Sequence, residues 1–122
     1  ILLTADEPLS RAVDALLSSP QKEFPVLDGI GRLAGLLDRD AMILGLRDQG
    51  PTAVVGAAMR ASEPLFSEQP LIEAFSRMRA KGARAEVVLD PTGRVAGILT
   101  QENVAEMMMI ANVQPGWRFK RR

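Results

Sequence analysis

Apolar and polar positions along this chain repeat one pattern twice. Each copy opens with a short apolar segment, followed by a stretch with apolar residues at helical spacing. Two apolar runs separated by turn residues come next, and a second helical stretch closes the copy. The expected elements lie at 1–3, 9–17, 23–28, 32–37 and 39–48 in the first copy, and at 65–66, 71–78, 85–90, 94–99 and 101–112 in the second. The predicted order is therefore strand, helix, strand, strand, helix in both halves.

The first helix of each copy carries its own start and stop signals. A capping side chain and a proline in the first turn, as in Asp6-Glu7-Pro8 and Ser67-Glu68-Gln69-Pro70, predict where it begins. Pro20 and Gly82 are expected to end it. The spacing predicts one apolar face in each copy, formed by Leu9, Ala12, Val13, Leu16 and Leu17, and by Leu71, Phe75 and Met78.

The two copies are also related residue by residue. Residues 1–50 align without a gap on residues 63–112, and twelve of the fifty aligned positions are identical. The identical positions are densest where Gly31–Leu37 aligns with Gly93–Leu99. Units of about 50 residues are too small to bury a sheet alone, so the two repeats are expected to pack together. The predicted organisation is a repeat at 1–50, a linker at 51–62, a repeat at 63–112 and a basic tail at 113–122.

Composition removes most catalytic classes. The 122 residues include no cysteine and no histidine, which excludes disulfides, thiolate nucleophiles, histidine triads and the common zinc sites. Fifteen basic residues balance fifteen acidic ones, so no overall field attracts nucleic acid. We find no paired carboxylates at motif spacing, no nucleophile with a base and no phosphate loop. The prediction is a non-catalytic α/β (α+β) domain without a metal site and without a nucleic-acid partner.

The duplicated core resembles a known family. Phe24-Pro25-Val26-Leu27-Asp28 with Gly31–Leu37, and Val87-Val88-Leu89-Asp90 with Gly93–Thr100, are similar to the core of cystathionine-β-synthase-type (CBS) domains. The resemblance covers essentially the whole chain and implies two pseudo-symmetric strand-helix-strand-strand-helix repeats packed as a CBS pair. It also implies a regulatory module that binds an adenine nucleotide (AMP, ADP or ATP) or S-adenosylmethionine, forms a homodimer and contains no further cofactor.

A narrower resemblance concerns the host protein. Gly97–Val104, followed by a methionine-rich helix, is similar to the CBS pair of site-2-protease-family membrane zinc metallopeptidases. A transporter, a kinase or a stand-alone sensor is the alternative host. The chain begins at Ile1 without an initiator methionine and is expected to be part of a longer protein, with this domain in the cytoplasm, at the membrane face if the host is membrane-embedded.

The resemblance places a nucleotide half-site at the start of the last helix. In the family motif, which here begins at Gly97, Thr100 takes the phosphate-binding position and Asn103 the ribose-binding position. A helix N-terminus offers free N–H groups and a positive dipole end to phosphate. The first repeat departs from the motif, because Asp38 replaces the hydroxyl and Ala41 the ribose acid. The alternative is that Thr100 and Asp38 are only N-caps.

Glu86 is an unusual residue in its strand, where it aligns with Phe24. Its carboxylate would either accept a hydrogen bond from a purine amino group or pair with Arg84 at an exposed strand end. Unpaired buried carboxylates are costly, which favours the second interpretation.

The last helix and the tail suggest contacts with partners. Val104, Met107, Met108 and Ala111 suffice for the core, which leaves Met109 and Ile110 as an apolar surplus for a dimer interface, with core packing alone as the alternative. The tail Trp117–Arg122 holds four basic residues and two aromatic ones. It is expected to be a solvated tail, with an anionic membrane surface or nucleic acid as alternatives.

Two functional hypotheses follow from the sequence. The first is a regulatory CBS pair that senses an adenine-type ligand, or that mediates dimerisation of a larger protein. The second is a ligand-free structural interaction module, which the departures from the motif in the first repeat favour. A thermal-shift screen with AMP, ADP, ATP and S-adenosylmethionine would separate the two hypotheses, because only the first predicts that one of these ligands binds.

Overall fold

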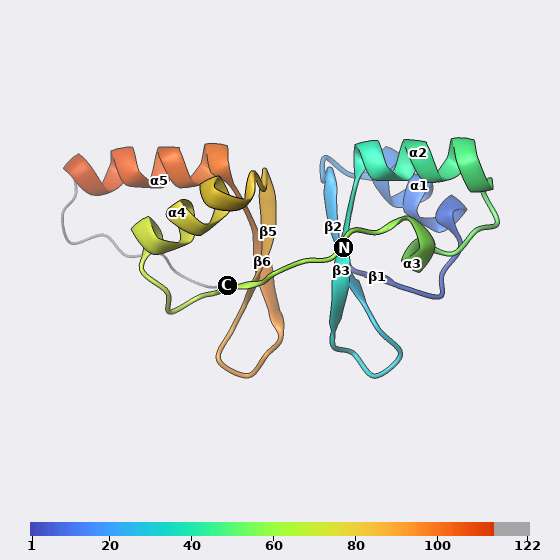
Figure 1. The fold of residues 1–122 in the computed structure, drawn as a ribbon, viewed down its shortest axis with the longest axis horizontal. Helices are drawn as coiled ribbons and strands as arrows, with labels where there is room; N and C mark the ends of the chain where they lie inside the picture. The colour runs from blue at the N-terminus through green and yellow to red at the C-terminus, as the bar shows by residue number, and fades with distance from the viewer. Residues whose placement is uncertain (114–122) are drawn as a thin grey trace. The chain divides into compact units, whose positions relative to one another are not determined.

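The computed structural model describes residues 1–113, and the chain divides into two compact units between Ser62 and Glu63. Each unit contains one three-stranded sheet with its helices on one face (Figure 1). The mixed α/β fold predicted from the sequence is confirmed. No helix within residues 1–113 is both long and apolar enough to cross a membrane. The tail Trp117–Arg122 lies outside the described residues.

The first unit is built around a central strand. Its elements are β1 (Leu3–Thr4), α1 (Leu9–Ser18), β2 (Glu23–Leu27), β3 (Leu33–Asp38), α2 (Arg39–Gln49) and α3 (Val55–Ala58). Strand β2 pairs in parallel with β1, across a helical crossover, and antiparallel with β3, across a short turn. The core between the sheet and the helices contains Leu3, Leu9, Phe24, Val26, Leu37 and Met42.

The second unit repeats this topology. Its elements are β4 (Leu65–Phe66), α4 (Leu71–Lys81), β5 (Ala85–Leu89), β6 (Val95–Thr100) and α5 (Gln101–Val113). Val88 lies opposite Gly97 in the β5–β6 pair, as Val26 lies opposite Gly35 in the β2–β3 pair. The sequence alignment of the two repeats therefore holds at the level of strand register.

The turns between the paired strands explain the aspartate that both repeats share. Asp28 Oδ1 accepts hydrogen bonds from the N–H groups of Ile30 and Arg32, both at 2.9 Å. Asp90 does the same with Thr92 and Arg94. Each turn contains a glycine with a positive φ, 85° at Gly31 and 86° at Gly93. Residues other than glycine rarely adopt this backbone conformation.

The start of the first helix differs from the prediction. Pro8 and Pro70 are themselves the N-cap residues of α1 and α4, and neither helix has a side-chain cap. Glu7 accepts a hydrogen bond from the N–H of Thr4 at 2.8 Å, so this carboxylate closes the turn after β1 instead. Leu17, expected on the apolar face of α1, is 79% exposed.

The helix ends agree with the sequence. Helix α1 ends at Ser18, two residues before Pro20, and α4 ends at Lys81, with Gly82 as its C-cap in the left-handed conformation. This glycine has a φ of 65°, which allows the chain to turn out of the helix at low cost.

The segment 51–62, expected as a linker, contains α3 and packs on the first unit. The N–H of Val55 donates to the carbonyl of Glu7 at 2.7 Å, and that of Gly56 to the carbonyl of Ala5 at 2.8 Å. The side chain of Val55 is fully buried in the first core. This segment therefore completes the first unit instead of only leading to the second.

Candidate functional site

Thr100 is the last residue of β6 and stands directly before α5. Its Oγ1 accepts a hydrogen bond from the N–H of Asn103 at 3.0 Å, so Thr100 caps the helix as expected. A hydroxyl that accepts through a lone pair still carries a hydrogen to donate. The capping role therefore leaves Thr100 able to donate one hydrogen bond to an anion.

The other N–H groups of the first turn of α5 are mostly used within the unit. The N–H of Gln101 donates to the carbonyl of Arg84 at 3.0 Å, and its side-chain amide donates to the carbonyl of Ala83 at 2.7 Å. Among the described residues, no acceptor faces the N–H of Glu102. One backbone donor is thus open beside the Thr100 hydroxyl, at the positive end of the helix dipole.

The side chain of Asn103 lies one turn into the helix. Its Nδ2 donates to Glu106 Oε1 at 3.2 Å, and the residue is exposed. That hydrogen bond orients the amide and leaves its oxygen available as a neutral acceptor. The start of α5 therefore brings together a hydroxyl donor, a backbone donor and an amide oxygen.

The corresponding position in the first repeat has different chemistry. Asp38 Oδ1 accepts a hydrogen bond from the N–H of Ala41 at 2.8 Å and caps α2. An ionised carboxylate has no hydrogen to donate and repels phosphate. The side chain of Ala41, at the place that Asn103 takes in the second repeat, offers no polar atom.

Glu86 is not at an exposed strand end, so the exposed position assigned to it was wrong. It is 4% exposed and lies inside β5, where its backbone pairs with Leu99. Side chains alternate along a strand, which places Glu86 on the same sheet face as Val88, a residue of the second core. Thr100 follows Leu99 and points to the opposite face, so the fold does not bring Glu86 and Thr100 together.

Gly97 lies on β6, opposite Val88. A Cβ atom at this position would meet no other atom within 4 Å. The glycine is therefore not required by packing among the described residues.

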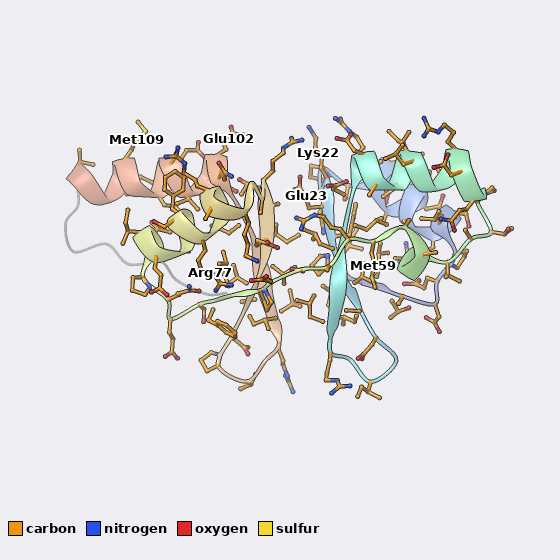
Figure 2. The ribbon with its side chains drawn as sticks, viewed as in Figure 1. Lys22, Glu23, Met59, Arg77, Glu102 and Met109 are labelled. Atoms are coloured by element: carbon orange, nitrogen blue, oxygen red, sulfur yellow. The ribbon has the colours of Figure 1, made fainter. Side chains whose placement is uncertain are left out.

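Helix α5 divides into a buried and an exposed side. Val104 is fully buried and Met107 packs against the second core, as the spacing predicted. The side chains of Met108 and Ala111 lie outside the described residues. Met109 is 69% and Ile110 44% exposed, and Figure 2 shows Met109 on the side of α5 that faces away from α4.

Two features of the second unit escaped the sequence analysis. Glu102 places a carboxylate in the first turn of α5 (Figure 2). The hydroxyl of Ser67, after β4, is buried and has no partner among the described residues. Ser67 was considered only as part of the start signal of α4, and its burial without a partner depends on surrounding groups that no motif records.

Comparisons with known proteins agree with this architecture. Residues 55–110 match the family model of the CBS domain. An uncharacterized protein of Mycobacterium tuberculosis is 33% identical over 93 residues, which is 75% of this chain and 26% of that protein. The chain thus spans about a quarter of the length of the curated relatives it matches.

Solved structures extend the likeness to nearly the whole chain. The CBS domain of a bacterial CNNM/CorC family Mg²⁺ transporter, solved with ATP, has a TM-score of 0.78 at 14% identity, over 89% of this chain and 78% of that one. CBSX2, solved with AMP, has a TM-score of 0.75 at 20% identity, over 92% of this chain and 89% of the other. The likeness shows that the fold is the same in all three.

Proposed function

The chain has the fold of a CBS domain pair, and we propose that it is a non-catalytic regulatory module that binds an adenine nucleotide through its second repeat. The observation that carries this proposal is the set of groups at the start of α5. Thr100 supplies a hydroxyl donor, Glu102 a backbone N–H and Asn103 an amide oxygen. The first two suit a phosphate, and the third suits a ribose hydroxyl.

Two structurally similar proteins support the choice of ligand. One was solved with ATP and the other with AMP. S-adenosylmethionine shares the adenosine group but replaces the phosphates with a sulfonium and an amino acid. A site that uses Thr100 for phosphate is expected to prefer the nucleotides.

The proposed site is confined to one repeat. At the first half-site, Asp38 presents a carboxylate where phosphate would bind. One nucleotide per chain is therefore the expected stoichiometry.

Regulation would follow from unequal affinity for two conformations. A ligand shifts a conformational equilibrium only as far as its affinities for the two states differ. The proposal is that the nucleotide favours one arrangement of the two repeats and that a host domain responds to it. The site-2 protease parentage of the host stays a prediction.

We also propose that the exposed apolar side chains of α5 form a homodimer interface. Met109 and Ile110 are exposed, and Val113 continues the same helix face. The polarizable, flexible methionine side chain adapts well to such an interface. Ile110→Glu is expected to shift a dimer to monomer in sedimentation velocity, whereas Ile72→Glu, at an exposed apolar position on α4, is expected to leave it unchanged. A monomer at high micromolar concentration in the unmodified chain would contradict the proposal.

Calorimetry with AMP, ADP, ATP and S-adenosylmethionine tests nucleotide binding directly. Thr100→Asp keeps an N-cap for α5 but brings a carboxylate to the phosphate position, and is expected to abolish binding. Thr100→Ser keeps the hydroxyl and serves as the matched control. Unchanged affinity in Thr100→Asp would show that phosphate binds elsewhere.

The second candidate function is a ligand-free interaction module. It is favoured by the capping hydrogen bonds, since Thr100 and Asp38 both have a structural role without a ligand. Absence of binding for all four ligands, together with a stable dimer, would select this alternative.

A further inference from the structure

The side chain of Asn103 has two ends that differ in chemistry. Its amide carries an acceptor oxygen, Oδ1, and a donor nitrogen, Nδ2, on a group whose two ends have nearly the same shape. Shape therefore does not decide which end faces a ligand, and the hydrogen-bond partners of the amide decide it instead. A ribose hydroxyl that donates a hydrogen bond requires the oxygen end.

Glu106 holds the nitrogen end of this amide. Its Oε1 accepts a hydrogen bond from Asn103 Nδ2 at 3.2 Å, from a position three residues further along α5. Side chains three positions apart are neighbours on a helix surface. An ionised carboxylate only accepts hydrogen bonds, so it pairs with the nitrogen and not with the oxygen. Glu106 therefore turns Asn103 Oδ1 away from itself, and no group within residues 1–113 donates to that oxygen.

The start of α4 contains the same kind of pair with its acceptor in use. Gln69 Nε2 donates to Glu73 Oε1 at 3.2 Å, and Gln69 Oε1 accepts a hydrogen bond from the N–H of Phe66 at 3.0 Å. A glutamate there fixes the nitrogen end of an amide while a donor occupies the oxygen end. The pair on α5 differs only in that its oxygen end has no donor among the described residues. The comparison indicates what Asn103 accepts from a ligand, namely one N–H or O–H donor.

We propose that Glu106 is a positioning residue, which directs Asn103 Oδ1 toward a ribose hydroxyl of the nucleotide. This inference rests on the proposed nucleotide site and adds that the Asn103–Glu106 pair makes the site selective for ligands with ribose hydroxyls. The hydroxyl donates to Asn103 as the N–H of Phe66 donates to Gln69, and Glu106 acts only through the amide. A site built to accept a hydroxyl hydrogen discriminates against the analogue that lacks it, because the oriented acceptor is then left without its partner.

The ratio of the affinities for ATP and 2′,3′-dideoxy-ATP, measured by calorimetry, reports on this hydrogen bond. The two ligands carry the same charge, so the ratio is insensitive to a charge that a variant removes near the site. The unmodified chain is expected to prefer ATP about tenfold. Glu106→Ala is expected to lower this preference about threefold, and Glu106→Gln, which keeps a neutral acceptor, is expected to lower it less. Glu73→Ala removes the same kind of partner from Gln69 and is the matched control, with an unchanged preference.

Asn103→Asp separates the orientation of the amide from other effects of Glu106. An aspartate has acceptor oxygens at both ends and needs no partner to orient it. In that background, Glu106→Ala is expected to leave the preference for ATP unlowered, and the double-mutant cycle measures the difference. The side-chain NH₂ resonances of Asn103 give a second measurement on the chain without nucleotide, because loss of the hydrogen bond in Glu106→Ala is expected to shift them.

Failure of the nucleotide site and failure of this inference give different results. If the unmodified chain binds no ATP, the proposed site is wrong and the role of Glu106 is overturned with it. If ATP binds but Glu106→Ala keeps the full preference, or lowers it equally in the Asn103→Asp background, the site stands and the inference alone is overturned. Unchanged Asn103 side-chain resonances in Glu106→Ala would overturn the inference as well, since Glu106 would then not hold the amide.

Discussion

Position 45 on α2 is glycine, and its counterpart on α5, position 107, is methionine. A Cβ atom at Gly45 would lie 2.8 Å from Cβ of Ala58 and 3.0 Å from Cδ1 of Leu9, so the missing side chain makes room for α3. Met107 instead packs its own side chain against the second core. The first repeat completes its core with a segment from outside the repeat, and the second uses a larger side chain. Two repeats with one topology can thus close their cores by different means, because packing requires only that the volume be filled.

The largest expected difference between the repeats is at the aligned pair Phe24 and Glu86. Phe24 is fully buried in the first core, and Phe24→Ala is expected to cost about 3–5 kcal/mol of unfolding free energy. Glu86→Ala is expected to cost less, because the loss of the carboxylate's interactions is offset by removal of its desolvation penalty. Urea unfolding followed by circular dichroism measures both. A larger loss for Glu86→Ala would show that this carboxylate holds the second unit together.

The next effect concerns the glycines at the sheet edges. Gly35→Ala is expected to destabilise the chain by about 1–3 kcal/mol, because the methyl group would meet the Arg60 carbonyl and Met59. Gly97→Ala is expected to leave the unfolding free energy nearly unchanged. Thermal unfolding of the two single variants compares them directly, and equal losses would mean that Gly97 is as crowded as Gly35.

Helix capping is expected to have a similar, smaller effect in both repeats. Asp38→Ala and Thr100→Ala each remove one acceptor for a backbone N–H and should cost about 1 kcal/mol. Only Thr100→Ala is expected to weaken nucleotide binding, since only that site has a hydroxyl to donate. Calorimetry and denaturant unfolding on the same two variants separate the two roles. Equal loss of nucleotide affinity in both variants would contradict the single-site assignment.

The smallest effect is a pH dependence at the surface of the second unit. Hydrogen bonding and charge from Lys81, with a further contribution from Arg77, lower the pKa of Glu63 below its ordinary value of 4.5. A lowered folded-state pKa stabilises the fold above about pH 4.5, and this stabilisation is lost as the pH falls through the folded value. Glu63→Gln is expected to flatten the acid limb of the melting temperature slightly between pH 5 and pH 3, relative to the unmodified chain. An unchanged acid limb would show that the ion pairs contribute nothing measurable, as many exposed pairs do.

A second acid-sensitive group, in the first unit, has a different origin. Backbone hydrogen bonds from Arg32 and Ile30 lower the pKa of Asp28 below 3.8. The contribution of the Asp28 carboxylate to the free energy of unfolding is likewise present at neutral pH and lost in acid. Asp28→Asn keeps one oxygen acceptor for the turn but cannot titrate. Its melting temperature between pH 5 and pH 3 is to be compared with that of the unmodified chain, as for Glu63→Gln. An unchanged melting temperature at pH 3 relative to pH 5 in the unmodified chain would contradict both assignments.

The sequence by itself determined the features that depend on short spacings. The strand pairs joined by Asp-containing turns and the caps at Asp38 and Thr100 follow from residues a few positions apart, where propensity and local hydrogen bonds decide the outcome. The twofold repeat followed from comparing the two halves of the sequence. One departure was local as well, since Pro8 is itself the N-cap of α1, where a capping side chain before the proline was expected.

Only the tertiary structure decided the features that need distant segments to meet. Glycine at position 35 makes sense because the chain returns at Met59 to lie against β3. The burial of Glu86 depends on the helices that cover its sheet face. Side-chain volume and unpaired backbone groups acquire their meaning from neighbours far along the chain, so no local pattern in the sequence records them.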